Sequence, residues 1–271
     1  MKQKRYVLYY LFQLILFVSA VSALFPFVYM MLVSLTQKTT LDFHFDIHEF
    51  TLVNYTRVFK NFDLLVNLRN SIIVTGGACF FNALISSMAA YVFAKKKFKG
   101  SRTLFTLYIA TLMIPGQVTL VSVFLIMKLL GLLNTFPALM FPIVNAFGVF
   151  LIKQFMEGIP NELLEAARID GCSEHRIFFS LVLPLITTVL ISLTIFTFIS
   201  SWNDFLWPLV IATKPHMKTL TLAIAALKGS STSNYGLIMS GSALAFLPPF
   251  LLYLILQKRF VEGIALSGIK G

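Results

Sequence analysis

Residues 71–94 read SIIVTGGACFFNALISSMAAYVFA, and the basic run KKKFK follows directly at residues 95–99. The 24 residues of the first run include no charged side chain. A helix rises about 1.5 Å per residue, so a run of this length can cross the roughly 30 Å of hydrocarbon in a bilayer. A cluster of lysines is typical of the point where such a helix enters the cytoplasm. The stretch therefore predicts a transmembrane helix.

Five further apolar runs of similar length occur in the 271 residues. Proline interrupts several of them, at Pro26, Pro115, Pro184 and Pro248, and the backbone groups freed there must find partners inside the protein. We therefore expect an all-α membrane protein with six transmembrane helices. The predicted spans are residues 6–35, 71–94, 103–127, 137–155, 177–202 and 235–256.

The composition supports a membrane protein over a soluble one. Hydrophobic residues make up 58% of the chain and charged residues 12%, whereas an ordinary soluble domain has roughly 45–50% and 25%. A soluble protein this apolar would expose large patches and aggregate. The net charge of +11 does not indicate nucleic-acid binding, because the lysines and arginines lie in short clusters between the apolar runs.

The distribution of basic residues predicts the orientation of the chain. When the segments between spans are assigned alternately to two sides, one side holds 14 Lys and Arg residues and the other holds 8. The richer side includes both chain ends and the densest cluster, residues 95–102. Cytoplasmic loops carry the excess of Lys and Arg, so we expect both termini in the cytoplasm.

We expect three parts in the chain. Residues 1–69 hold the first span and an outer segment, and the first span is too long to be the apolar region of a signal peptide. Residues 70–257 hold the other five spans, and residues 258–271 form a cytoplasmic tail. The outer segment at 203–234 contains an apolar run, 219–227, that is too short to cross a bilayer, so we expect a short helix packed on the bundle.

The polar segment between the fourth and fifth spans, at about residues 157–176, has strong local signals. Pro160 is typical of a helix start, and residues 161–169 are good helix formers. Gly171 can adopt the left-handed conformation that ends a helix, and Ser173 can cap the next helix. The segment therefore predicts a helix, a turn and a second helix, tied at both ends to transmembrane spans.

Residues 165–184, EAARIDGCSEHRIFFSLVLP, resemble the EAA loop of ABC importer permeases. That pattern has E-A-A, a Gly four residues after the last Ala, and I-x-L-P ten residues beyond the Gly. Leu181 stands where Ile is usual, and Cys172 stands where Ala is usual in sugar permeases. Ala166 and Ala167 leave one face of the predicted helix bare enough to enter a partner's cleft, and the resemblance implies that this segment docks an ATPase. The implied docking residues are Glu165, Ala166, Ala167 and Gly171, with Arg168 and Asp170 framing the contact.

The resemblance extends over nearly the whole chain. Asn70-Ser71, Pro115, the run Trp202-Asn203-Asp204 and the tail at 263–271 look like the carbohydrate permeases of the maltose-transporter type, in particular the second, maltose-G-like member of the pair. This implies a type I ABC importer permease fold in a multi-pass protein of the bacterial plasma membrane. The implied partners are a homologous permease in a heterodimer, two cytoplasmic ATPase subunits and an extracytoplasmic sugar-binding protein. In that family the C-terminal tail also reaches the ATPases, and the corresponding residues here are Ser267, Gly268, Ile269, Lys270 and Gly271.

The chain itself is not expected to be an enzyme. It has no G-x-x-x-x-G-K-[ST] loop to hold nucleotide phosphates, and no nucleophile elbow, general acid–base pair or zinc motif. His44 and His48 are four residues apart, but their segment is interpreted as a solvated loop rather than a metal site. We expect no bound cofactor or metal, and we expect ATP and Mg²⁺ to be used by a separate ATPase chain.

Several polar side chains lie within or beside the predicted spans. Amides at this depth often only join helices, and Trp202 at a span end is equally well an interfacial anchor, so a structural role remains open for each. Membrane lipid is a further partner, since the run at 95–99 can bind anionic headgroups, although topology alone explains its charge. The candidate residues of a sugar path are Asn82, Gln117, Asn145, Trp202, Asn203 and Asp204.

We therefore expect a permease subunit of an ATP-driven importer of sugars, in particular oligosaccharides, that forms half of the translocation path. Two alternatives remain open. One keeps the ABC machinery but changes the cargo to amino acids, metals or osmolytes. The other is a secondary carrier coupled to an ion gradient, which requires buried ionisable residues, and none stands firmly at the centre of a predicted span.

Overall fold

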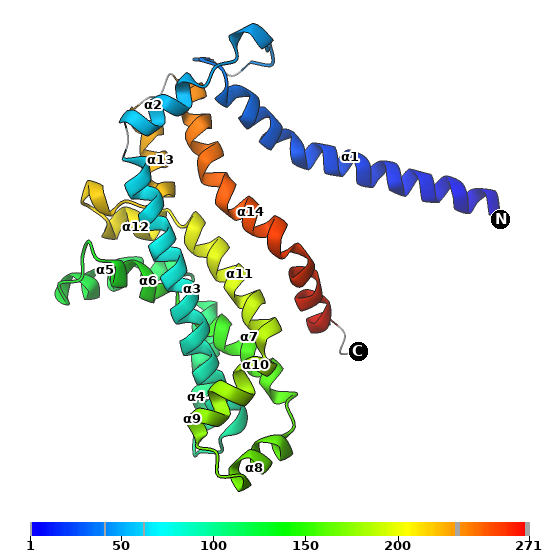
Figure 1. The fold of residues 1–271 in the computed structure, drawn as a ribbon, viewed down its shortest axis with the longest axis vertical. Helices are drawn as coiled ribbons and strands as arrows, with labels where there is room; N and C mark the ends of the chain where they lie inside the picture. Colours follow the sequence, from blue (N-terminus) through cyan, green and yellow to red (C-terminus); the bar gives the residue numbers. More distant parts are fainter. Residues whose placement is uncertain (1, 41, 62, 231–233, 269–271) are drawn as a thin grey trace. The chain divides into compact units, whose positions relative to one another are not determined.

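The computed structural model describes residues 2–40, 42–61, 63–230 and 234–268, and every regular element in these residues is a helix (Figure 1). The all-α prediction is thus confirmed. The helices form two compact units. One unit is Met1–Leu64 with Ala223–Leu247, and the other is Leu65–Leu222 with Pro248–Gly271.

Three helices in the described residues are each long and apolar enough to cross a membrane, and three bent pairs of helices meet the same criterion together. The described residues therefore contain three to six spans, a range that includes the six predicted from the sequence. The unbroken spans are Leu8–Ser34 within α1 (Lys2–Ser34), all of α3 (Leu64–Lys95), and Tyr235–Gln257 within α14 (Tyr235–Gly268).

The third, fourth and fifth predicted spans are broken rather than straight, with bends of 105°, 49° and 77°. Pro115 lies in the first break, and Ile114 before it is extended, because proline disfavours helix in the preceding residue. Pro184, the other predicted break point, lies inside the short helix α10 (Leu183–Leu185), two residues before the third break at Ile186. The broken spans consist of α4 (Ser101–Ala110), η2 (Thr111–Met113) and α5 (Gly116–Leu129); α6 (Phe136–Met140), η3 (Phe141–Ile143) and α7 (Ala146–Glu157); and α9 (Glu174–Arg176), the π-helix η4 (Ile177–Val182), α10 (Leu183–Leu185) and α11 (Thr187–Asn203).

Pro26 lies within the first apolar run, and α1 continues through that residue as one helix. Helix α14 likewise continues through Pro248 and Pro249. Each proline removes one backbone hydrogen bond, whereas unwinding a lipid-exposed helix would leave several backbone groups without partners. Continuing the helix is therefore the less costly solution at these positions.

In the first unit, Asn54 of α2 (Val53–Asn61) fixes the turn that follows α1. Its side chain is fully buried and donates to the carbonyl oxygens of Ser34 at 3.1 Å and Thr36 at 2.7 Å. Gly236 of α14 approaches the same turn so closely that a Cβ would lie 2.0 Å from the Thr36 oxygen. The short 3₁₀ helix η1 (Ile47–Glu49) lies between α1 and α2 in the chain.

In the second unit, one apolar cluster joins the middle of α7 to the start of the fifth span, and we call it the inner core. Its buried members include Val149, Ile152 and Met156 of α7 together with Ile177 and Val182 of η4. Figure 1 shows α8 (Asn161–Ile169) and α9 at one end of this unit, beside the chain between α3 and α4. The inner core therefore extends toward the predicted coupling segment.

A second apolar cluster lies around Trp207 of α12 (Leu206–Ile211). The Trp207 indole N–H donates to the carbonyl oxygen of Ala138 in α6 at 2.8 Å. The short helix predicted at residues 219–227 is confirmed as α13 (Leu220–Ser230), and its residue Leu222 belongs to this cluster.

Asn70 and Ser71, two of the residues that carry the family resemblance, hold the chain before α13 against α3. The Asn70 amide donates to the carbonyl oxygens of His216 at 2.8 Å and Lys218 at 3.0 Å. The Ser71 hydroxyl accepts from the Leu220 N–H at 2.8 Å. His216 lies in the 3₁₀ helix η5 (Pro215–Met217), so these bonds fix η5 and the start of α13.

Small residues allow α3 and α7 to approach closely. Ser86 and Ala90, which are four residues apart in α3, are fully buried. Gly148 of α7 faces Ser86, and a Cβ added to it would lie 2.5 Å from the Ser86 hydroxyl oxygen. Close approach of small residues is one way in which membrane helices associate without a hydrophobic driving force.

Candidate functional site

The coupling segment, residues 157–176, has the helix–turn–helix form that its local sequence predicts. Helix α8 begins directly after Pro160. Gly171 adopts the left-handed conformation with φ 77°, which only glycine enters without strain. The Ser173 hydroxyl then accepts from the N–H of Arg176 at 3.4 Å and caps α9.

Helix α8 has an inward side and an outward side. Leu164 is 2% exposed and belongs to the inner core, and Ala167 is half-buried against that core. Ala166 and Ile169 point outward, and Ile169 is 85% exposed. The sequence predicts one bare face shared by Ala166 and Ala167, but consecutive residues of a helix are about 100° apart, so only Ala166 lies on the exposed side.

Glu174 joins the coupling segment to the end of α3. One carboxylate oxygen accepts from the Tyr91 hydroxyl at 2.8 Å, and the other accepts from the Arg168 guanidinium at 2.9 Å and forms an ion pair with Lys96. The hydrogen bond to Glu174 raises the pKa of Arg168 above its ordinary value. Arg168, which was predicted to frame the ATPase contact, is therefore bound within the chain.

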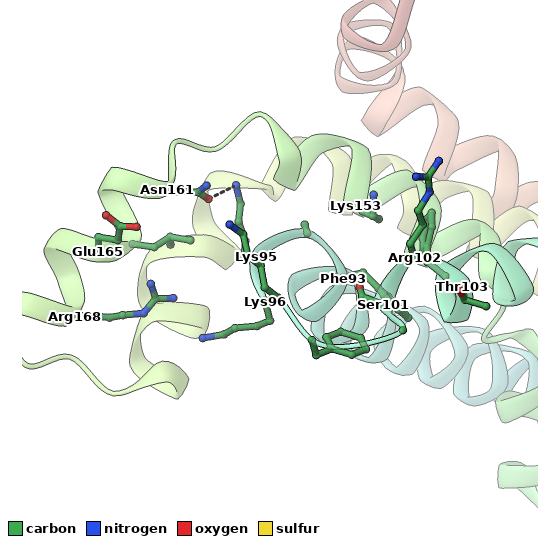
Figure 2. Close-up of a pocket in the computed structure, with 16 residues that line it drawn as sticks. Phe93, Lys95, Lys96, Ser101, Arg102, Thr103, Lys153, Asn161, Glu165 and Arg168 are labelled. Atoms are coloured by element: carbon green, nitrogen blue, oxygen red, sulfur yellow. Dashed lines mark hydrogen bonds between the residues drawn. The ribbon is translucent and has the colours of Figure 1, made fainter.

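Lys95 makes a second connection between α3 and α8. Its ammonium donates to the carbonyl oxygen of Ile159 and to the side-chain oxygen of Asn161 at 3.2 Å, as Figure 2 shows for Asn161. No sequence motif marks Lys95 or Glu174 as a site residue. Arg168 is six positions from Glu174, but the contacts of Lys95 and Glu174 that join α3 to the coupling segment are made by residues between 64 and 83 positions apart in the chain, and no local pattern indicates such pairs.

Three acidic side chains of the coupling segment remain available to a partner. Glu162, Glu165 and Asp170 are exposed, and none of their carboxylates makes a hydrogen bond or ion pair with another residue that the structure describes. Ser267 and Gly268 are the last residues of α14, and Ile269, Lys270 and Gly271 lie outside the described residues. The docking role of this tail thus stays a prediction.

Two of the six candidate path residues, Gln117 and Asp204, line one pocket of about 290 Å³. The pocket lies where helices break, and its wall includes the start of α5, the end of η3 and the start of α12. The Asp204 carboxylate accepts from the N–H of Trp207, which also lines the pocket, at 3.2 Å. Thr119 adds a hydroxyl to the wall.

Asn82 and Asn145 are placed elsewhere and make structural hydrogen bonds. Asn82 is 2% exposed, donates to the Thr197 hydroxyl of α11 at 2.8 Å, and accepts from Ser86 at 3.0 Å. It therefore joins α3 to α11. The Asn145 side chain caps α7 by accepting from the Phe147 N–H at 3.1 Å.

Trp202 and Asn203 do not line the pocket either. Trp202 is 2% exposed, and its ring stacks on Phe198 with centroids 5.5 Å apart. The Asn203 amide donates to the carbonyl oxygen of Ile199 within α11 at 2.9 Å. Among the six candidates, the geometry thus brings only Gln117 and Asp204 together in one cavity.

The protein is similar over most of its length to known transport proteins. The family model described as the binding-protein-dependent transport system inner membrane component matches residues 82–265. The chain is 35% identical to the arabinooligosaccharides transport system permease protein AraQ of Halalkalibacterium halodurans, over 92% of each chain. It is 31% identical to the lactose transport system permease protein LacG of Rhizobium radiobacter, over 92% of each, and 32% identical to the trehalose/maltose transport system permease protein MalG of Thermococcus litoralis, over 93% of each.

A solved structure has the same fold. It is a chain from the crystal structure of a bacterial ABC transporter involved in the import of the acidic polysaccharide alginate, with a TM-score of 0.82 and 21% sequence identity, over 94% of this chain and 96% of that one. At this identity the match concerns the fold alone. The family model and the relatives above 30% identity also show the family. The chain belongs to the binding-protein-dependent transport system inner membrane components, which are multi-pass permease subunits of ABC importers.

Proposed function

We propose that this chain is the permease subunit of an ATP-driven importer of oligosaccharides, and that α8 transmits the movement of a separate ATPase to the membrane helices. The observation that carries the proposal is the construction of α8. It exposes Ala166, Ile169 and the carboxylates of Glu162 and Glu165, which have no partner among the described residues, and Glu174 and Lys95 tie it to α3. A force applied to its exposed side therefore reaches α3 and the inner core directly.

The proposed assembly contains a homologous second permease, two ATPase subunits and an extracytoplasmic sugar-binding protein. The family description, which names binding-protein-dependent transport, supports the last of these partners. The excess of basic residues beside the coupling segment supports a cytoplasmic position for α8 and for both termini. Residues 267–271 are proposed to add to the ATPase contact from the C-terminal tail.

The proposed cargo rests on the relatives and on the pocket at the helix breaks. The relatives are named for arabinooligosaccharides, lactose and trehalose or maltose. The pocket volume of about 290 Å³ is close to the lower end for sites that bind small molecules. The amide of Gln117, the hydroxyl of Thr119 and the carboxylate of Asp204 offer hydrogen-bond partners for sugar hydroxyls. Transporters commonly place substrate sites beside discontinuous helices of this kind.

Copurification of the tagged chain with its ATPase tests the proposal. The test variant is Ile169→Asp, which places a charge on the exposed side of α8 without removing a buried contact. Leu129→Asp is a matched control, because Leu129 is also the last residue of its helix and is 87% exposed. We expect wild type and Leu129→Asp to retain both a second permease and an ATPase, and Ile169→Asp to retain the permease but lose the ATPase.

Other outcomes would exclude the proposal. If wild type purifies with no ATPase and its transport follows an ion gradient, the chain works as a secondary carrier. If Ile169→Asp and Leu129→Asp retain equal amounts of ATPase, the exposed side of α8 is not the docking surface. The cargo is tested separately, by measuring whether a binding protein loaded with oligosaccharide, but not one loaded with an amino acid, stimulates the ATPase of the assembled complex.

A further inference from the structure

A pocket of about 850 Å³ lies between the chain that joins α3 to α4 and the helices α7 and α8 (Figure 2). We call it the basic pocket because of the residues that line it. A single carboxylate, that of Glu165, is among its lining side chains, against six cations. The cations are Lys95, Lys96, Lys97, Arg102, Lys153 and Arg168.

Two of these cations have no partner in the described part of the chain. Lys96 and Arg168 share Glu174, and Lys153 pairs with Glu157. Lys95 donates to Ile159 and Asn161. By contrast, Lys97 and Arg102 make no hydrogen bond or ion pair with any described side chain or carbonyl, although both line the cavity. The pocket thus holds positive charge that the described residues leave unneutralised.

The start of α4 adds to the attraction for an anion. Gly100 occupies the cap position in the left-handed conformation with φ 82°, and no side chain caps the helix there. Residues 100–103 line the pocket. The first N–H groups of a helix lack intrahelical acceptors, and the helix dipole places partial positive charge at this end. An anion in the pocket would therefore meet both side-chain and backbone donors.

Apolar surface adjoins the charged lining. The rings of Phe93, Phe98 and Phe105 form one contact group, with Phe93 5.3 Å from Phe105 and 6.1 Å from Phe98 between centroids. One turn beyond the pocket, α4 exposes Leu104 and Leu107, which are 53% and 64% accessible. A ligand with a phosphate at one end and hydrocarbon at the other fits this sequence of surfaces better than a free anion does.

We propose that the basic pocket binds the phosphate of an anionic phospholipid headgroup, with the acyl chains lying along the exposed side of α4. Arg102 and Lys97 supply the unneutralised charges, and the start of α4 supplies backbone N–H donors. The lipid belongs to the membrane leaflet on the side of the coupling segment. This site does not depend on which solute the transporter carries.

The test measures lipid binding to the assembled transporter by native mass spectrometry. The probes are phosphatidylglycerol and phosphatidylcholine with the same acyl chains. The pocket variant is Lys97→Gln with Arg102→Gln. The control is Lys99→Gln with Arg176→Gln, which removes one lysine and one arginine charge from the same region outside the pocket. Because the pocket variant removes the two cations that lack a partner among the described residues, we expect it to bind phosphatidylglycerol roughly tenfold or more weakly.

The control should bind phosphatidylglycerol as wild type does, and phosphatidylcholine should bind weakly to all three proteins. If the pocket variant and the control lose equal amounts of phosphatidylglycerol binding, the proposal is wrong, because the loss then depends on the net charge of the region and not on the pocket. If inorganic phosphate fully displaces phosphatidylglycerol, the ligand of the pocket is a soluble anion and not a lipid, and the proposal is wrong. Loss of the ATPase subunits from the pocket variant alone would show that the pocket is a protein interface instead.

Discussion

The Tyr91 hydroxyl donates a 2.8 Å hydrogen bond to the Glu174 carboxylate, although 83 positions separate the two residues in the chain. Tyr91 lies near the end of α3, and Glu174 is the first residue of α9, which follows α8 in the chain. Lys96 and Arg168 bind the same carboxylate. One side chain therefore connects α3, α8 and α9, and this connection is central to the proposed coupling.

Glu174→Gln should weaken this connection while keeping the hydrogen bond from Tyr91. The variant loses the charge that binds Lys96 and Arg168, and we expect a local loss of about 1–2 kcal/mol because both pairs are partly exposed. Amide hydrogen exchange in residues 160–176 should become faster, and ATPase stimulation by the loaded binding protein should fall several-fold. Hydrogen-exchange mass spectrometry and an ATPase assay measure these two effects.

Glu157→Gln is the matched control for this experiment. Glu157 also forms an ion pair, with Lys153, and its side chain is 46% exposed, as is that of Glu174. It does not contact α3 or α8 through any described hydrogen bond. If both variants reduce ATPase stimulation equally, the network around Glu174 has no special part in coupling.

Cys172 offers a test of orientation that uses a native residue. It lies in the turn between α8 and α9 and is partly exposed, whereas Cys79 is buried in α3. A membrane-impermeant maleimide should label Cys172 in inside-out vesicles and not in intact cells, and bound ATPase should slow the labelling. Cys172→Ser should abolish the signal. Labelling of Cys172 from outside intact cells would contradict the predicted topology.

Gly148→Ala should destabilise the protein by about 1–3 kcal/mol, because the added methyl group would collide with Ser86 and disturb its bond to Asn82. Gly76→Ala is the control, since a Cβ at that helical position of α3 meets no atom within 4 Å. That change should be neutral or stabilise the helix by up to about 1 kcal/mol. Thermal unfolding in detergent compares the two variants, and equal midpoints would show that α3 and α7 do not pack closely at Gly148.

Asp204→Asn should reduce sugar uptake several-fold without loss of assembly, because the charged hydrogen-bond acceptor in the pocket becomes neutral. Asn203→Ala is its control, since the neighbouring Asn203 amide bonds, within the described parts of the chain, only to the Ile199 carbonyl and lies outside the pocket. Uptake of labelled oligosaccharide into vesicles measures both. A larger defect in Asn203→Ala than in Asp204→Asn would exclude the pocket as part of the path.

The features that the sequence predicts correctly are those with local causes. The extent of α8, the left-handed Gly171 and the Ser173 cap follow from helix-terminus preferences within a few residues. The break at Pro115 follows from the chemistry of proline. The bend of 105° at the first break does not, because the direction of a chain after a break depends on packing against other helices.

The same distinction applies to the site. Glu174 and Lys95 connect the coupling segment with α3 through residues at least 64 positions away in the chain, so no motif around them indicates this role. The polarity of Asn82 at depth is visible in the sequence, but only the structure shows that Thr197 and Ser86 satisfy its amide. An unsatisfied amide would suit a sugar path, whereas a satisfied one joins helices.

The central claim, that ATP used by a separate chain drives transport through this permease, is tested most directly by sugar uptake in proteoliposomes. The assembled complex is reconstituted into the vesicle membrane, and ATP is supplied either inside or outside the vesicles. The loaded binding protein is placed on the side of the membrane opposite to the ATPase. We predict that uptake of labelled oligosaccharide requires ATP on the ATPase side and continues when ionophores collapse the proton and sodium gradients. Uptake that continues without ATP and stops with the ionophores would contradict the account.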